Sequence, residues 1–471
     1  MKYSAYAILK RINIIFLIIS LVVVGGIVFS QEIKGMNLDW IRKGELFMRV
    51  YQDTVEDNPY EDNQAFCAWF RLDNKINLKD WNALLNVNVE ARGKAFLGED
   101  TEEDIDILLR EAYLELRRES FNLGLGRQII TWGKLDNVVI LDRISPQDYT
   151  SFVLFDKQQR KQATPMVTYT YYGQDLQFDI AFLPIFKPSC VRFFGADWAA
   201  FGHIIQMIEE GAYPEATKNL VRNIRIEKKD RFTEDVFKNS QIGFRLKSRF
   251  EDIDWAIYYM YIYNRIPTLR EKTTKGNTLK QFLYIPTQAN LNAWVASNPS
   301  DEDLVLEREH SRTHITGLDF ETVVGQLGLR GELGLFLDMP YLKSDFSYTT
   351  KDTLSFGIGI DHTTPGNLYL NFQFIEDIVF DYEELFSQEE YSHQLTSTLT
   401  KDFFRGKLTF NLDSTYRLSY HDWMVNPQLT YQFGKGLEAC LGGFIFEGGS
   451  TTLFGRYSTK DLIYVEVKYQ F

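Results

Sequence analysis

The sequence predicts an all-β fold: a transmembrane antiparallel β-barrel with long loops at one end and short turns at the other. Two observations lead to this prediction. Segments of about ten residues alternate apolar and polar side chains, and the connections between them are alternately long and short. A third observation is that 15% of the residues are aromatic although 24% are charged. Membrane barrels place such aromatic side chains in girdles at both membrane interfaces.

The segment ending at Phe471 shows the alternation most plainly. One face carries Ile463, Val465, Val467, Tyr469 and Phe471, and the other carries Tyr464, Glu466, Lys468 and Gln470. In a barrel the apolar face contacts lipid and the polar face lines a wet lumen. A strand of a β-sandwich has the same pattern, so this segment alone leaves both folds open.

Comparable segments recur along the chain, with the length that a tilted strand needs to cross a bilayer. We expect eighteen strands, with sixteen as the alternative count. Eighteen is an even number, as in single-chain bacterial barrels. The segments are 44–53, 64–74, 81–93, 106–118, 121–130, 164–172, 175–183, 240–250, 254–264, 313–323, 326–338, 353–362, 367–376, 393–400, 406–419, 423–433, 437–446 and 462–471.

The connections decide between barrel and sandwich. Tight turns are expected at 119–120, 173–174, 251–253, 324–325, 363–366 and 434–436. Long polar loops alternate with them at 131–163, 184–239, 265–312, 377–392 and 447–461, and only the link 420–422 is short on the loop side. A membrane barrel explains this alternation, with turns in the periplasm and loops outside, whereas a sandwich does not.

Residues 1–30 have the pattern of a secretory signal peptide. Lys2, Lys10 and Arg11 precede an apolar run from Ile12 to Val28. The run is near the ~20 residues of a spanning helix, so a membrane anchor is the alternative. We therefore expect the barrel over residues 31–471, in the outer membrane of a Gram-negative cell. Its expected partners are membrane lipid, lipopolysaccharide and the barrel assembly machinery, the last through the strand ending at Phe471.

The remaining composition argues against several other functions. The formal net charge of −13 disfavours a nucleic-acid partner. The three cysteines, Cys67, Cys190 and Cys440, are too far apart for a zinc motif or a disulfide framework, although one pair could still form. No hydrolase or phosphate-binding motif is present, so we expect neither catalysis nor a cofactor. His310 and His314 have a helical metal-binding spacing, but the simpler interpretation is two loop histidines.

Charged residues at lumen-facing positions are the first candidates for function. Charges on the lipid face cost ~2–4 kcal/mol each at mid-membrane, so they are expected to point inward. Because eighteen strands enclose a wide channel, we expect these side chains to line a pore. The candidates are Glu111, Glu115, Arg117, Arg127, Arg330, Glu332, Asp413 and Arg417.

The long loops supply further candidates. Residues 218–231 are basic and residues 377–392 are acidic. Each set is either a solvated loop or a functional one that folds inward or, for the basic run, contacts lipopolysaccharide phosphates. The loop-contact candidates are Arg222, Arg225, Lys228 and Lys229. Residues 199–210 have a helical apolar pattern, which predicts a short helix in or over the lumen.

Three short motifs carry a resemblance to a known family. Residues 110–114 read R-E-A-Y-L, residues 126–133 read G-R-Q-I-I-T-W-G, and residues 145–148 read S-P-Q-D. They resemble an uncharacterised family of porin-like outer-membrane proteins that is known only as a domain of unknown function. That family has Asn where this chain has Ser145. The G-R-Q strand is more distantly similar to one in alginate-export porins.

The same motif can be interpreted physically. Gly124 and Gly126 allow close backbone approach, and Arg127 could pair with Glu111 or Glu115 on the neighbouring strand. The alternative is that Arg127 contacts a substrate directly.

The resemblance implies transport across the outer membrane. We expect a channel or transporter for small or hydrophobic compounds. The alternatives are a structural or partner-docking barrel of an export system and a barrel-resident hydrolase. No sequence feature requires a particular oligomeric state.

Overall fold

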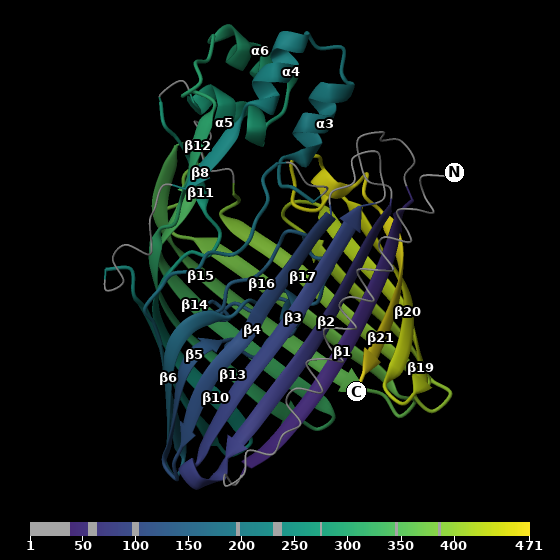
Figure 1. The fold of residues 1–471 in the computed structure, drawn as a ribbon. Helices are drawn as coiled ribbons and strands as arrows, with labels where there is room; N and C mark the ends of the chain where they lie inside the picture. The colour runs from purple at the N-terminus through teal and green to yellow at the C-terminus, as the bar shows by residue number, and fades with distance from the viewer. Residues whose placement is uncertain are drawn as a thin grey trace.

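One closed β-sheet dominates the structure (Figure 1). The computed structural model describes residues 38–54, 64–96, 103–194, 198–228, 238–273, 276–343, 347–384 and 388–471. The predicted signal peptide and Lys229 therefore lie outside the described residues.

The sheet has eighteen antiparallel strands in chain order, and the last pairs with the first. The predicted barrel is thus confirmed, with all eighteen predicted segments in it. The strands are β1 (Leu38–Asp53), β2 (Gln64–Leu78), β3 (Ala83–Phe96), β4 (Glu103–Arg117), β5 (Phe121–Gln128), β6 (Thr164–Tyr172), β7 (Leu176–Leu183), β9 (Gln241–Phe250), β10 (Ile253–Tyr263), β13 (Arg312–Val324), β14 (Leu327–Leu342), β15 (Tyr348–Thr363), β16 (Leu368–Val379), β17 (Tyr391–Phe403), β18 (Leu408–Arg417), β19 (Asp422–Gly434), β20 (Leu437–Glu447) and β21 (Leu462–Gln470).

The seam between β1 and β21 closes the barrel. Glu45 lies opposite Gln470 and Asp53 opposite Leu462. Beyond the last strand, the N–H groups of Gly44 and Phe471 each donate to the carbonyl of the other, at 2.8 and 3.0 Å. A closed sheet leaves no unpaired edge, which a bilayer would not tolerate.

The two faces of the wall differ as the alternation predicts. On β21 the side chains of Ile463 and Val465 are each 52% exposed on the outside, whereas Tyr464 between them is 3% exposed. Leu395, Leu429 and Leu441 are likewise exposed on other strands. The outer face is therefore largely apolar.

Several strand ends differ from the predicted bounds; β1, for example, begins at Leu38 rather than at residue 44. Two of the differences have local reasons. β5 ends at Gln128, before the predicted residue 130, because the N–H groups of Ile129 and Ile130 donate to the side chains of Glu111 and Ser145. β3 begins at Ala83, after the predicted residue 81, because Lys79–Trp81 form a 3-10 helix. At these points side-chain contacts and turn geometry replace the strand ladder.

The two longest loops form a small folded unit at the loop end, which we call the outer lobe (residues 201–228 and 268–309) (Figure 1). It contains α3 (Gly202–Glu210), α4 (Glu215–Arg222), β8 (Arg225–Lys228), β11 (Thr268–Glu271), α5 (Gly276–Tyr284), α6 (Gln288–Ala296) and β12 (Val305–Glu309). β12 pairs antiparallel with β11 and parallel with β8. The helix predicted at 199–210 is confirmed as α3, whereas the rest of the outer lobe was missed. No described helix is long and apolar enough to cross a membrane.

Candidate functional site: an inner loop across the lumen

The connection from β5 to β6 turns into the barrel. We call residues 129–163 the inner loop. It contains one short helix, α2 (Lys157–Arg160). Its first part contacts the lumen side of β13–β17, and its last part contacts β1–β4. The inner loop therefore reaches two opposite parts of the wall and narrows the space inside the barrel.

Glu332 on β14 anchors the first part. One carboxylate oxygen accepts the backbone N–H groups of Lys134 and Leu135 at 2.6 and 2.7 Å. The other accepts those of Ile140 and Leu141 at 2.8 and 2.9 Å. Glu332 is 3% exposed, and four N–H donors satisfy a buried carboxylate that would otherwise be costly. The side chain predicted to line a pore instead supports the inner loop.

Apolar packing supplements this anchor. Leu135, Ile140, Leu141 and Ile144 form one buried cluster with lumen-side residues of the wall. Glycines in the wall make room for them: a Cβ added to Gly357 would lie 2.6 Å from Leu135 Cδ1. A Cβ added to Gly317 would lie 2.4 Å from Leu141 Cδ2. Because glycine has no side chain, these positions of the wall leave room for the apolar side chains of the inner loop.

The tip reaches further across the lumen. Asp136 pairs with Arg330 on β14 and accepts a hydrogen bond from Asn371 Nδ2 at 2.7 Å. Asn137 Nδ2 donates to Thr398 Oγ1 on β17 at 3.0 Å. Arg330 also pairs with Glu321 and Asp361, at 3.0 and 3.2 Å. The candidate Arg330 thus faces the lumen, where it holds the tip.

An internal ion pair holds the inner loop to itself. Lys161 Nζ lies 2.7 Å from Asp142 Oδ2 and donates to Thr131 Oγ1 at 2.7 Å and to the Ile130 carbonyl at 3.0 Å. Burial lowers the pKa of the Lys161 ammonium, and the adjacent carboxylate opposes that shift. Lys157 pairs with the same carboxylate at 3.0 Å. The start and end of the inner loop are therefore tied together.

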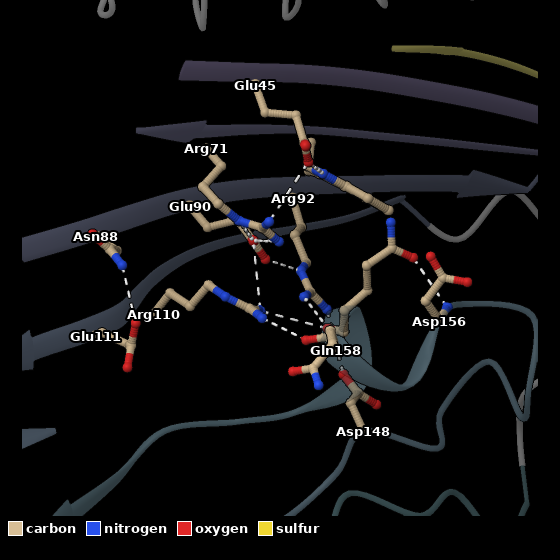
Figure 2. A network of polar contacts seen from close by, with 12 residues as sticks. Glu45, Arg71, Asn88, Glu90, Arg92, Arg110, Glu111, Asp148, Asp156 and Gln158 are labelled. Atoms are coloured by element: carbon tan, nitrogen blue, oxygen red, sulfur yellow. Dashed lines mark hydrogen bonds and ion pairs between the residues drawn. The ribbon is translucent and has the colours of Figure 1, made fainter. Parts of the chain in front are cut away.

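An arginine-rich network on β1–β4 receives the last part of the inner loop (Figure 2). Glu90 is 1% exposed and pairs with Arg71 at 2.6 Å, with Arg110 at 3.8 Å and with Arg92. Arg110 also donates to the Gln158 carbonyl at 2.6 Å, and Arg92 donates to the Gln159 carbonyl at 3.1 Å. These arginines both neutralise a buried carboxylate and hold α2.

A β-bulge explains how Arg110 joins this network. Asn88 pairs with Glu111 and Val89 with Leu109, so Arg110 has no partner in the ladder. The extra residue changes the alternation, and both Arg110 and Glu111 reach lumen-side groups (Figure 2). Glu111 accepts from Asn88 Nδ2 at 3.0 Å and from the Ile129 N–H at 2.9 Å. Simple alternation cannot predict two adjacent inward charges.

The pairing expected for Arg127 does not occur among the described ion pairs. Arg127 lies opposite Ala112, and Glu115 lies opposite Gly124. Glu111 has the partners given above, and Glu115 pairs with Arg117 at 2.6 Å. The bulge at Arg110 changes the alternation of β4, and Gly126 next to Arg127 has a φ of 136°, so the regular alternation that the expectation assumed is broken here.

The remaining candidates lie in three places. Asp413 faces the lumen on β18 and accepts from Thr398 Oγ1 and Asn411 Nδ2 at 2.6 and 2.7 Å. Arg417, at the loop end of β18, pairs with Asp422 at 3.2 Å. Arg222, Arg225 and Lys228 belong to the outer lobe, where Arg222 pairs with Glu209 and Glu215 at 2.6 Å each.

The lumen side of β17 and β18 is polar, and the tip of the inner loop meets it at Thr398. We call it the polar stripe, and it consists of Thr396, Thr398 and Thr400 on β17 with Thr409, Asn411, Asp413 and Thr415 on β18. Thr400 Oγ1 donates to Asn411 Oδ1 at 2.7 Å, and most of these side chains are partly exposed. The stripe continues upward along β18 to Arg417.

A cavity of about 980 Å³ lies between the inner loop and the outer lobe; we call it the outer cavity. Arg143, Ser145 and Tyr149 of the inner loop line one side, and Phe201, Leu283 and Tyr284 of the outer lobe line another. Arg417 also lines it, which joins the outer cavity to the polar stripe. The other arginines of this cavity were not predicted, because loop arginines far apart in the chain share no sequence pattern.

The side chains that could bind a metal are dispersed in the part of the chain that the structure describes. No three metal-ligating side chains come together in the described part of the chain. His310 Nδ1 lies 2.8 Å from the Asn264 carbonyl, and His314 Nδ1 lies 2.9 Å from the Tyr259 hydroxyl. The cysteines Cys67, Cys190 and Cys440 form no disulfide with one another.

A comparison with known protein families identifies the family of this chain. A family model described as "Protein of unknown function (DUF1302)" matches residues 48–436. The chain belongs to the DUF1302 family. The predicted membership of a family of unknown function is thus confirmed, while the similarity to alginate-export porins stays a prediction. No curated protein sequence matches this DUF1302 chain.

Solved structures share its fold at low identity. OccAB1 of Acinetobacter baumannii has a TM-score of 0.51 at 8% identity, over 94% of this chain and 99% of that one. OccAB3 of the same organism has a TM-score of 0.49 at 10% identity, over 92% and 99%. OccK5 (OpdH) of Pseudomonas aeruginosa has a TM-score of 0.47 at 12% identity, over 92% of this chain and 97% of that one. At these identities the first likeness supports the barrel fold of the DUF1302 chain and nothing about its substrate.

Proposed function

We propose that this DUF1302 protein is an outer-membrane channel whose lumen is narrowed by the inner loop. The apolar outer face of a closed sheet needs lipid around it. In this arrangement the short turns face the periplasm and the outer lobe faces the outside. Eighteen strands enclose more space than wall side chains alone fill.

The observation that carries the proposal is the division of the lumen. Apolar packing and Glu332 seat the inner loop against one part of the wall. The polar stripe beside this seat, on β17 and β18, keeps partly exposed hydroxyl, amide and carboxyl groups. A barrel that only supported other proteins would gain nothing from polar, partly exposed groups in its interior. A solute path from the outer cavity along β18 uses them.

Reconstitution tests the proposal. Purified full-length protein in planar bilayers should give stable conductance steps, and liposomes containing it should swell in small solutes. A variant in which residues 134–141 are replaced by a short Gly-Ser linker should give larger steps and admit larger solutes. The control is Glu115→Gln, which changes a carboxylate that pairs with Arg117 of the same strand. Failure of the wild type and of the shortened variant to conduct or to swell liposomes would contradict the channel.

The docking alternative makes a different prediction. A barrel that serves an export system should co-purify with a periplasmic or inner-membrane protein in mild detergent. Such a partner together with zero conductance would favour docking over transport.

A further inference from the structure

We propose that the outer cavity binds organic anions that carry an apolar body, before they pass the inner loop. This inference rests on the proposed channel for its role, although the binding itself does not require conduction. It names a substrate class for a site between the inner loop and the outer lobe.

The charges around the outer cavity are strongly unequal. Five cations line it: Arg143, Arg265, Lys343, Arg417 and Arg456. Among the described residues of the lining, Asp142 is the one carboxylate; its side chain is 1% exposed, and it already pairs with Lys157 and Lys161. In a chain of formal net charge −13, a lining with this excess of cations attracts anions from solution.

Three of the five cations have only carbonyl partners among the described hydrogen bonds and ion pairs. Arg143 Nε donates to the Ile140 carbonyl at 2.8 Å. Arg265 donates to the carbonyls of Lys187 and Ile144, at 2.9 and 2.6 Å. Arg456 Nε donates to the Thr452 carbonyl at 3.2 Å. Carbonyl dipoles orient a guanidinium, but they leave its full charge unbalanced.

The other two cations provide the contrast. Arg417 pairs with Asp422 at 3.2 Å, and Lys343 pairs with Glu383 at 3.0 Å. Burial lowers the pKa of Arg265, which reflects a charge held away from water with no carboxylate beside it. A guanidinium nevertheless stays protonated at neutral pH. A carboxylate ligand would therefore give Arg143 and Arg265 a counter-charge, and it would add to the charge that Asp422 places near Arg456.

The apolar residues of the lining favour a ligand whose anionic group is attached to an apolar body. Ile262, Phe336 and Leu283 contribute aliphatic and aromatic surface, and Tyr149, Tyr284 and Tyr348 add rings with a polar edge. Arg143 lies over the Phe336 ring, 5.3 Å from its centroid. The volume of about 980 Å³ is at the upper end of drug-sized ligand pockets. A small inorganic anion would leave most of this surface in contact with water.

Direct binding to the full chain in detergent tests the inference. The probes are 2-naphthoate, the neutral 2-naphthalenemethanol and the cationic 2-naphthylmethylamine, measured by calorimetry. We expect naphthoate to bind at least about tenfold more tightly than the alcohol, because a charge-assisted hydrogen bond is worth more than a neutral one. The amine should show no saturable binding. Equal affinity for naphthoate and alcohol, or tighter binding of the amine, would overturn the inference.

Matched arginine variants locate the site. Arg143→Gln should weaken naphthoate binding about tenfold and leave the alcohol unaffected. Arg222→Gln, in the outer lobe and already paired with Glu209 and Glu215, should change neither. Equal losses in both variants would refute the assignment to the outer cavity. So would competition by inorganic phosphate at the same concentration as naphthoate, which would indicate a simple anion site.

The two proposals fail separately. Naphthoate binding without conductance would refute the proposed channel function and support the anion site. Conductance without naphthoate binding would support the channel function and refute the anion site. Retained mobility of the unheated barrel on gels shows that each variant is folded.

Discussion

Replacing Glu332 by Gln should loosen the inner loop while leaving the barrel closed. In the wild type each carboxylate oxygen accepts two backbone N–H groups. An amide of the same shape keeps one oxygen, so it can still accept two of the four. Its NH₂ group then faces two N–H donors that lose their acceptor. Each buried donor left unsatisfied costs about 1–3 kcal/mol.

The expected cost is therefore roughly 2–6 kcal/mol, applied to the inner loop only. Because about 1.4 kcal/mol corresponds to a factor of ten, the population with a detached loop should rise at least about 30-fold. Hydrogen–deuterium exchange of a peptide spanning residues 134–141 measures this population. Single-channel recordings should show more frequent transitions to a larger conductance.

The control variant is Glu115→Gln, which removes a carboxylate paired with Arg117 near the turn end of β4. Exchange over 134–141 should be unchanged in it. If exchange there is also unchanged in Glu332→Gln, the four hydrogen bonds do not hold the inner loop and the reasoning fails.

Two glycines give further predictions. Gly357→Val should displace the inner loop by overpacking against Leu135, at a cost of about 1–3 kcal/mol, and increase exchange over 134–141. Gly93→Val is its control, because a Cβ there would meet nothing closer than 3.9 Å; equal exchange in both would contradict the packing argument. A Cβ added to Gly44 would lie 2.1 Å from the Phe471 ring. Gly44→Val should therefore displace that ring and lower the temperature at which the barrel unfolds on gels. A transition at the wild-type temperature would show that Phe471 moves aside without cost.

The strands were predictable because their signal is local. The lipid face of a membrane strand must be apolar and the lumen face is free to be polar, so each segment carries a period of two in its own residues. The end at Phe471 oriented the series, and the alternating loop lengths then distinguished a barrel from a sandwich. The structure confirms this from β1 to β21.

The candidate site was predictable only in part. Inward charges such as Arg330, Glu332 and Asp413 followed from the same alternation. The partners of these charges could not be predicted in the same way, because a partner such as Asp136 lies nearly two hundred residues from Arg330 in the chain. The inward position of Arg110 could not be predicted from the alternation, because a bulge adds one residue to β4. The arginines of the outer cavity come from separate loops and share no spacing.

The sequence by itself determined the wall of this protein: eighteen strands, the two faces of each strand, and the ends at which turns and loops lie. Those features depend on contacts with solvent and lipid that each short segment makes on its own. Only the tertiary structure decided that residues 129–163 fill part of the lumen, that two long loops fold together as the outer lobe, and that arginines from separate loops gather between them. These depend on meetings between distant residues, such as Glu332 with the backbone of 134–141, which no local pattern records.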